Sequence, residues 1–319
     1  MDNNMNFPIS IIVTAYNRTE FLKDALESLD RQTADHHQFE VILITNFEYD
    51  IEKYVESLNI KHYNIEGTHG EYIWKGLQES SGKIIGFLED DDIYHKDKIK
   101  ILIEMFERDI WYFKNEVKKF RNVKDLIALD FISQGTQKKE ESDTIIISGD
   151  RIRCNPSMEF NLSSIAVRKD LLTPFVDILP KVVTGLDTFL WFCFLEYRAN
   201  GMYSYKKLNF YRVHDSISHS MNGNQSNLLP WYIRMLSFYE VVFTVFTNPK
   251  LIKLATLRVA ILKTKIYLIS PTNNNLDHSY SKHLLKAGLI PSKCTTGSTS
   301  LLLKYIFFRL KDIFSYRET

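Results

Sequence analysis

The stretch Gly86-Phe87-Leu88-Glu89-Asp90-Asp91-Asp92-Ile93-Tyr94 joins an apolar run to four consecutive acidic residues. Residues 84–88 have the apolar side chains of a buried central strand, so the acids come where that strand ends. Adjacent carboxylates repel one another unless water or a cation screens them. Ligands of open α/β sheets bind at the carboxyl ends of the strands. The stretch therefore predicts either a divalent-cation site or a solvated acidic turn before a helix that starts near Lys96.

Apolar runs with strand character alternate with segments of helical periodicity in the first part of the chain. The strands predicted from them are 9–13, 39–45, 60–65 and 84–88, and the helices are 19–31, 50–58, 71–80 and 96–107. This alternation predicts an α/β fold, a mostly parallel sheet flanked by helices on both faces.

The second half of the chain is less regular. Residues 110–143 are polar, and we expect an insertion or helical excursion there with a mobile tip at 134–142. Strands at 145–147 and 162–168, a helix at 186–199 and one or two strands within 203–213 are predicted next. The polar run 222–227 is the predicted boundary between a domain of residues 1–224 and a helical, basic region of residues 225–319.

Composition limits the classes of function. The 319 residues are 45% hydrophobic and carry a formal charge of +1, which gives no sign of nucleic-acid binding. The three cysteines are far apart and form no C-x-x-C pair, so a disulfide framework or thiolate zinc site is not expected. We find no signal peptide and no apolar window long enough to span a membrane. These observations predict a cytoplasmic protein.

The charge is unevenly distributed along the chain. Residues 250–319 carry twelve Lys/Arg against three Asp/Glu, a charge of +9, which leaves −8 for residues 1–249. In Leu301–Phe314 the aliphatic residues share one helical face, with Lys304 and Lys311 opposite. Such a helix either makes a peripheral contact with an anionic membrane or packs against the rest of the fold or a second subunit.

Five segments, in this order along residues 7–220, together resemble family 2 glycosyltransferases of the GT-A fold. They correspond to the family's first strand and nucleotide loop, its D-x-D metal motif, its acceptor-side strand, its G-E-D-x-x-L segment and its closing Y-R-x-H segment. In this chain they are 8–18, 76–92, 161–168, 185–190 and 211–218.

The resemblance implies an enzyme and a reaction. It implies inverting transfer of a sugar from a nucleotide sugar, most simply a UDP-sugar, to a hydroxyl of a glycan or lipid-linked glycan. A divalent cation, Mn²⁺ or Mg²⁺, would stabilise the leaving diphosphate. The implied metal contacts are Asp91 and Asp92, with Glu89 and His214 beside them.

The same resemblance implies the remaining site residues. Asp187 is the implied general base. The implied donor-binding residues are Thr14, Ala15, Tyr16, Arg18, Asn46, Asp90 and Arg212.

Structural roles stay open for four of these residues. Asp187 could simply cap a helix, and His214 could be a structural histidine. Arg212 either neutralises phosphate or pairs with a surface acid. Tyr16 either stacks on the base or belongs to the core.

Departures from the family pattern leave two other functions open. Thr45-Asn46-Phe47-Glu48 stands where the family usually has two aspartates that read base and ribose, and Leu186 replaces the acid before Asp187. These departures fit a non-catalytic glycan-binding or scaffold protein on a transferase fold. A sugar-nucleotide pyrophosphorylase is less well supported, because Thr14–Thr19 has no glycine.

Overall fold

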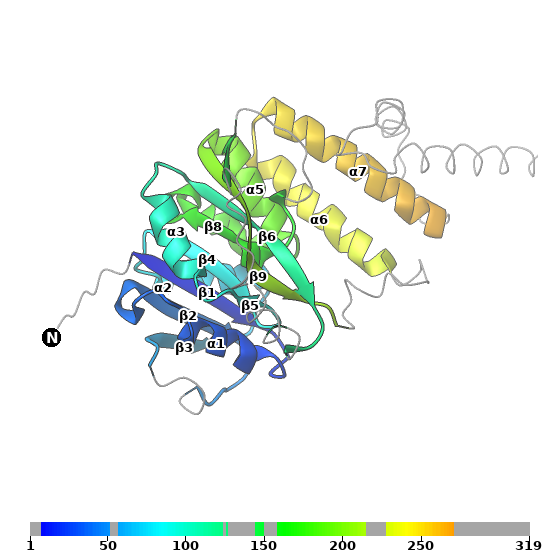
Figure 1. Ribbon diagram of the computed structural model, residues 1–319. Coiled ribbons are helices and arrows are strands. Elements are labelled where there is room, and N and C mark those ends of the chain that lie inside the picture. The colour runs from blue at the N-terminus through cyan, green and yellow to red at the C-terminus, as the bar shows by residue number, and fades with distance from the viewer. Residues whose placement is uncertain are drawn as a thin grey trace, which may run out of the picture. The chain divides into compact units, whose positions relative to one another are not determined.

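The computed structural model of the chain describes residues 8–51, 57–123, 126, 144–149, 158–214 and 228–270 (Figure 1). It divides into two compact units. The first contains the described residues up to His214, and the second contains helices α6 (Leu229–Val245) and α7 (Pro249–Ile269). The predicted boundary at residues 224 and 225 lies outside the described residues and stays a prediction.

A nine-stranded sheet forms the centre of the first unit, in the order β3-β2-β1-β4-β8-β6-β9-β5, with β7 paired to β9. The strands are β1 (Ile9–Ala15), β2 (Phe39–Thr45), β3 (Ile60–Asn64), β4 (Ile84–Glu89), β5 (Ile93–Tyr94), β6 (Tyr112–Phe120), β7 (Thr144–Ser148), β8 (Ile165–Arg168) and β9 (Asn200–Arg212). The α-helices of this unit are α1 (Leu22–Asp30), α2 (His69–Glu79), α3 (Lys98–Phe106) and α5 (Leu186–Tyr197). Short 3₁₀ turns are η1 (His36–Gln38), η3 (Leu162–Ser164), η4 (Lys169–Leu171) and η5 (Thr173–Lys181).

The half of the sheet formed by β3, β2, β1 and β4 is parallel, as the alternation of apolar segments predicts. Side chains that alternate along the strands cover its two faces. Ile11, Val13 and Leu43 belong to one core cluster with the apolar residues of α1 and α3. Ile42 and Ile44 pack with Tyr72 of α2 in another. Helices therefore cover both faces, and the carboxyl ends of β1, β2 and β4 meet at one edge (Figure 1).

The other half of the sheet is mixed rather than parallel. β8 runs antiparallel to β4 and β6, and β5 and β7 run antiparallel to β9, whereas β6 and β9 are parallel. The expectation of an insertion or helical excursion beginning at residue 110 is wrong for β6. The sequence hides this strand because Lys114 and Asn115 interrupt its apolar pattern, yet both side chains are buried and hydrogen-bonded.

Smaller differences concern element boundaries. The predicted strand 162–168 begins as the 3₁₀ turn η3 and becomes extended only at Ile165. Residues 52–56 of the predicted helix 50–58 and the predicted mobile tip at 134–142 lie outside the described residues.

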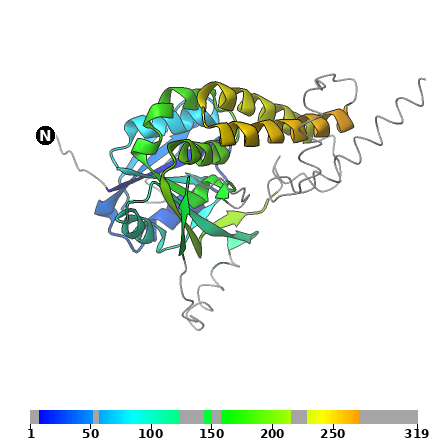
Figure 2. The ribbon, with the colours of Figure 1, turned by 90° about the horizontal axis from the view of Figure 1, so that it is seen from above.

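In the second unit, α6 and α7 lie side by side (Figures 1 and 2). Phe238 and Val242 of α6 and Leu251, Ala255 and Val259 of α7 are buried. Among the described residues, no helix combines the length and apolar character needed to cross a bilayer. The predicted amphipathic helix at 301–314 lies outside the described part of the chain.

Candidate active site

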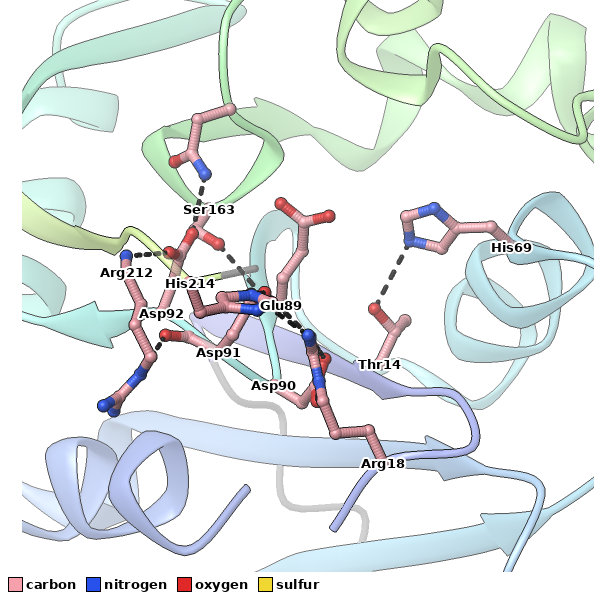
Figure 3. Close-up of polar contacts among 11 residues, drawn as sticks. Thr14, Arg18, His69, Glu89, Asp90, Asp91, Asp92, Ser163, Arg212 and His214 are labelled. Carbon is pink, nitrogen blue, oxygen red and sulfur yellow. Dashed lines mark hydrogen bonds and ion pairs between the residues drawn. The ribbon is translucent and has the colours of Figure 1, made fainter. Parts of the chain in front are cut away.

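The four acids lie at the carboxyl end of β4, where the sequence predicts them (Figure 3). Glu89 is the last residue of the strand, and Asp90–Asp92 form the turn that follows. The turn is anchored at both ends, since Asp90 N donates to Thr14 O at 3.1 Å and Asp92 N to Glu89 O at 3.1 Å. The end of β1 thereby lies directly beside the acidic motif.

Arg18 binds two of the acids. Its guanidinium forms a fork on Asp90, with Nε 2.6 Å from Oδ2 and Nη2 2.7 Å from Oδ1. The same Nη2 lies 2.8 Å from Asp91 Oδ2. Burial alone would lower the pKa of Arg18, but Asp90 and Asp91 raise it above its ordinary value. Burial also raises the pKa of Asp90, to about 6, although Arg18 opposes that rise.

His214 completes this cluster. Its Nε2 lies 2.8 Å from Asp91 Oδ2 and 3.1 Å from Arg18 Nη1. One ring nitrogen cannot both donate to the carboxylate and accept from the guanidinium, so only one of these contacts is a hydrogen bond in any tautomer. Asp91 Oδ2 and His214 Nε2 thus form a pair of potential ligand atoms, and the guanidinium of Arg18 lies beside both.

Asp92 is fully buried and turns away from this pair (Figure 3). Its Oδ2 accepts from Asn161 Nδ2 at 2.6 Å, and its Oδ1 accepts from Arg212 N at 3.2 Å. Burial and the charge of Asp91 raise its pKa to about 7, while hydrogen bonds from Ser163 and Asn161 oppose the rise. Its oxygens therefore hold the surrounding segments together.

Arg212 lies behind the motif. Its Nη2 donates to Asp24 Oδ2 at 2.6 Å and its Nε to the carbonyl of Asp91 at 3.0 Å. The guanidinium also lies 4.4 Å and 4.7 Å from the ring centroids of Phe21 and Phe120. Only 5% of the residue is exposed, so the guanidinium braces the turn from within the fold.

Glu89 has a different environment. Its backbone N–H donates to Ser163 Oγ, and its carboxylate projects away from Arg18 (Figure 3). Burial and then the charges of Asp91, Asp92, Asp187 and Asp90 raise its pKa well above the ordinary value. The negative charge around Glu89 is therefore larger than Arg18 and Arg212 neutralise.

These side chains fit a hard divalent cation. They offer carboxylate oxygens and one imidazole nitrogen as ligand atoms, and the carboxylates carry an excess of negative charge. Asp91 and His214 are the best placed, because their ligand atoms already lie together. Within the part of the chain that the structure describes, no three acidic, histidine or cysteine side chains form a ready-made metal cage. Arg18 is the cation that contacts the Asp91–His214 pair.

A cavity of about 540 Å³ opens beside Glu89 and Asp90. This volume is in the usual range for a small-molecule site. The lining residues come from the ends of β1 and β4 and the residues that follow them, from α2 and the segment leading into it, and from the segment before α5. They are Thr14, Tyr16, Arg18, Gly67, Thr68, His69, Tyr72, Glu89, Asp90 and Val183.

The predicted nucleotide loop forms one wall of this cavity. Thr14 and Ala15 end β1, and Tyr16 is 57% exposed with its ring tilted against Tyr72 at 6.1 Å. Tyr16 is therefore not a core residue. Asn46, predicted to contact the donor, binds the loop itself. Its Oδ1 accepts from Asn17 N at 2.8 Å, and its Nδ2 donates to Asn17 Oδ1 at 2.6 Å.

Asp187 lies in the first turn of α5, where the helix dipole favours a negative charge. Its Oδ1 accepts from Thr188 N at 2.8 Å and its Oδ2 from Asn161 N at 3.3 Å. Burial raises its pKa to about 6, and the charge of Glu159 adds to the rise. Asn161 contacts the carboxylates of both Asp187 and Asp92, and the charge of Asp187 helps to raise the pKa of Glu89, so Asp187 lies beside the acidic motif.

The sequence interpretation missed His69, Lys114 and the individual role of Asn161. His69 lines the cavity with Nε2 3.4 Å from Thr14 Oγ1, and burial lowers its pKa to about 4. Lys114 is buried, and burial lowers its pKa to about 7, while the charge of Asp187 opposes that shift. A lone histidine or lysine has no local signal for such a position. Asn161 could have been suspected from its place directly before the acceptor-side strand.

The first part of the chain is similar to a known protein family. Residues 10–148 match the model described as glycosyl transferase family 2. This segment belongs to that family. The family 2 segment contains the predicted nucleotide loop and the acidic motif, whereas Asp187, Arg212 and His214 lie after it.

Among the curated relatives is a protein named as a glycosyltransferase. An uncharacterized glycosyltransferase of Rickettsia felis is 30% identical over 113 residues, which are 34% of this chain and 18% of the relative. The match thus takes up less than a fifth of the relative's length.

Solved structures show that the fold is GT-A. TarS of Staphylococcus aureus, residues 1–349 in complex with UDP, superimposes with a TM-score of 0.56 at 15% identity, covering 94% of this chain and 89% of that one. The mannosyltransferase PcManGT from Pyrobaculum calidifontis, in complex with GDP-Man and Mn²⁺, gives a TM-score of 0.53 at 11% identity and covers 96% and 87%.

Proposed function

We propose that this chain is a metal-dependent, inverting glycosyltransferase that moves a sugar from a nucleotide sugar to a hydroxyl of a glycan or lipid-linked glycan. The observation that carries the proposal is the joining of Asp187 to the acidic motif. Asn161 contacts the carboxylates of both Asp187 and Asp92, so a candidate base and candidate diphosphate-side acids share one site. A solvated acidic turn before a helix does not account for that arrangement.

The donor is proposed to bind in the 540 Å³ cavity. The exposed ring of Tyr16 is available to stack on the base, and the clamp between Asn46 and Asn17 holds the loop in place for it. Arg18 supplies positive charge for the diphosphate. The neighbouring TarS structure contains UDP, which supports a UDP-sugar as the first donor to test.

Asp91 and His214 are the proposed metal ligands, with Glu89 beside them. When bound, a divalent cation stabilises charge on the leaving diphosphate as a Lewis acid. We assign Asp92 and Arg212 to the support of this group rather than to direct contact with metal or phosphate. Both are buried, and their polar atoms are engaged by protein groups.

Asp187 is the proposed general base. The acceptor oxygen attacks the anomeric carbon, its proton passes to the Asp187 carboxylate, and the bond between that carbon and the diphosphate oxygen breaks. A pKa of about 6 leaves Asp187 mostly ionised at neutral pH while keeping it basic enough to take a proton. Attack from the face opposite the leaving group inverts the anomeric centre.

An aromatic pair next to the base supports a carbohydrate acceptor. Phe160 directly precedes Asn161, is 43% exposed, and packs edge to face with Tyr211 at 5.1 Å. An exposed ring offers an apolar surface to the C–H face of a sugar. Peripheral membrane binding through the basic C-terminal residues, and a cytoplasmic location, are part of the proposal on sequence grounds alone.

Calorimetric titration of UDP and GDP, each with and without Mn²⁺, tests the donor and metal parts of the proposal. The wild type should bind one nucleotide in a Mn²⁺-dependent manner, and Asp91→Asn should lose that dependence while keeping its melting temperature. Binding of glycans without any nucleotide binding would instead favour the non-catalytic alternative.

A further inference from the structure

The polar groups of Asn161 are hydrogen-bonded, and its two nitrogens join the two sides of the candidate active site. Its backbone N–H donates to Asp187 Oδ2 at 3.3 Å, and its side-chain Nδ2 donates to Asp92 Oδ2 at 2.6 Å. Its Oδ1 accepts from Asn209 Nδ2 at 2.9 Å, and its carbonyl accepts from Ser164 Oγ at 2.6 Å. Only 4% of the residue is exposed, so these contacts are shielded from water.

We propose that Asn161 is a positioning residue, which holds the base Asp187 at a fixed place relative to the acidic motif. The inference rests on the proposed function, because it takes Asp187 as the base. Asn161 itself is not expected to touch the substrates.

The backbone of Asn161 explains why this residue type suits the position. Its φ of 71° and ψ of 110° lie at positive φ, a region that non-glycine residues rarely occupy. Strain of this kind persists where surrounding contacts hold it, and asparagine tolerates it better than most side chains. Glycine and aspartate also tolerate positive φ. Of the three, only asparagine can both donate to Asp92 and accept from Asn209.

The contacts of Asn161 also show which elements this residue holds in place. Asp92 follows β4, Asp187 lies on α5 and Asn209 lies on β9, so one residue, through its side chain and its backbone N–H, ties together three elements that are distant in sequence. Asn209 is in turn held by Asn115 Nδ2 of β6 at 2.6 Å. If the side-chain tie is removed, the backbone N–H of residue 161 is free to move away from Asp187. A misplacement of about 1 Å can lower turnover by about 10²-fold.

Asn161→Gly separates the side-chain tie from the backbone, because glycine accepts positive φ and keeps the N–H. The matched control is Arg198→Gly, which places a glycine at another left-handed position (φ 54°) at the far end of α5. Both variants are compared with wild type and with Asp187→Asn. The probe is release of UDP from UDP-GlcNAc, or of GDP from GDP-Man, with Mn²⁺ and water as acceptor, measured across pH.

We expect Asn161→Gly to lower kcat at least tenfold while KM for the donor stays within about threefold. The acid limb of its pH profile should move to higher pH, because the N–H that favours the ionised Asp187 is displaced. Crystal structures should show the distance from N of residue 161 to Asp187 Oδ2 increased beyond hydrogen-bonding range. Arg198→Gly should match wild type in all three measurements.

Two results overturn the proposal. One is a kcat for Asn161→Gly within twofold of wild type while Asp187→Asn is inactive, which leaves the proposed function intact. The other is an unchanged distance from N of residue 161 to Asp187 Oδ2 in the variant's crystal structure. If the wild type releases neither nucleotide, the proposed function fails, and the crystal structures alone decide whether Asn161 holds Asp187.

Discussion

Arg18 Nη2 lies 2.8 Å from Asp91 Oδ2, the same carboxylate oxygen that His214 Nε2 approaches to 2.8 Å. The guanidinium therefore lies next to the two groups that are proposed to hold a metal ion. A positive side chain and a divalent cation compete for the same negative charge. Arg18 is thus expected to leave Asp91 when metal binds and to become available to the donor's diphosphate.

Arg18→Gln should change metal and nucleotide binding in opposite directions. Without the guanidinium, Asp90 and Asp91 lose their ion pairs, so Mn²⁺ alone should bind several-fold more tightly. UDP should bind about tenfold more weakly in the presence of Mn²⁺, the effect of losing about 1.4 kcal/mol of charge-assisted hydrogen bonding. Calorimetry with each ligand measures both constants.

The control for Arg18 is Arg31→Gln, since Arg31 is an exposed arginine that pairs with Glu27 on α1. It should leave both affinities unchanged. Weaker Mn²⁺ binding by Arg18→Gln would contradict competition between the guanidinium and the metal.

Tyr16→Ala tests stacking on the nucleotide base. Loss of an exposed aromatic ring that stacks on a base weakens binding by about 1–3 kcal/mol, so Kd for UDP should rise about 5- to 150-fold. Tyr16→Phe should bind UDP like wild type, because it keeps the ring. Tyr205→Ala removes another exposed tyrosine (53% exposed) and serves as the control. Equal affinities for all three variants would exclude Tyr16 from the base site.

Glu40→Gln tests the network at the amino-terminal end of the sheet. The fully buried carboxylate accepts from Ser10 Oγ and Ser81 N at 2.6 Å and from Lys61 Nζ at 2.8 Å. Burial alone would raise the pKa of Glu40, but these donors lower it below the ordinary 4.5. We expect the free energy of unfolding to fall by about 2–3 kcal/mol at pH 7.

The pH dependence of this difference has a definite sign. Because the folded pKa of Glu40 is depressed, its contribution is complete above pH 4.5, the unfolded value, and is lost as the pH falls through the folded pKa. The free energies of unfolding of wild type and variant, measured by urea denaturation, should therefore converge as the pH falls below 4.5. Glu104→Gln, an exposed glutamate on α3, should change nothing above or below that pH. A difference that stays constant with pH would mean that the charge of Glu40 is unimportant.

The sequence predicted the parallel half of the sheet because its strands are continuous apolar runs with helices between them. It did not predict β6, since buried Lys114 and Asn115 depend on hydrogen bonds with Ser164 and Asn209, which are distant in the chain. The position of the acids after β4 followed from the pattern alone. The different contacts of these acids could not be predicted, because acids adjacent in sequence point in different directions. Asp91 faces Arg18 and His214, whereas Asp92 faces Asn161.

The same limit applies to the other predicted site residues. Asn46 and Arg212 were predicted to contact the donor, whereas the proposed function gives Asn46 the role of holding the loop and Arg212 that of supporting the acidic turn. The structure adds that Asn46 binds Asn17 and that Arg212 binds Asp24, pairings between segments that no local pattern specifies. Asp187 was assigned by resemblance, and only the fold shows that Asn161 connects it to the acidic motif.

The rate of UDP release from UDP-GlcNAc tests most directly whether Asp187 is the general base. In the wild type, log kcat/KM should rise with unit slope up to about pH 6, the pKa of Asp187, and then level off. Asp187→Asn should lower kcat by about 10²-fold or more and abolish that acid limb, with UDP affinity nearly unchanged. The exposed Asp177→Asn should behave like wild type. Turnover by Asp187→Asn within a few-fold of wild type, with the acid limb intact, would contradict the account.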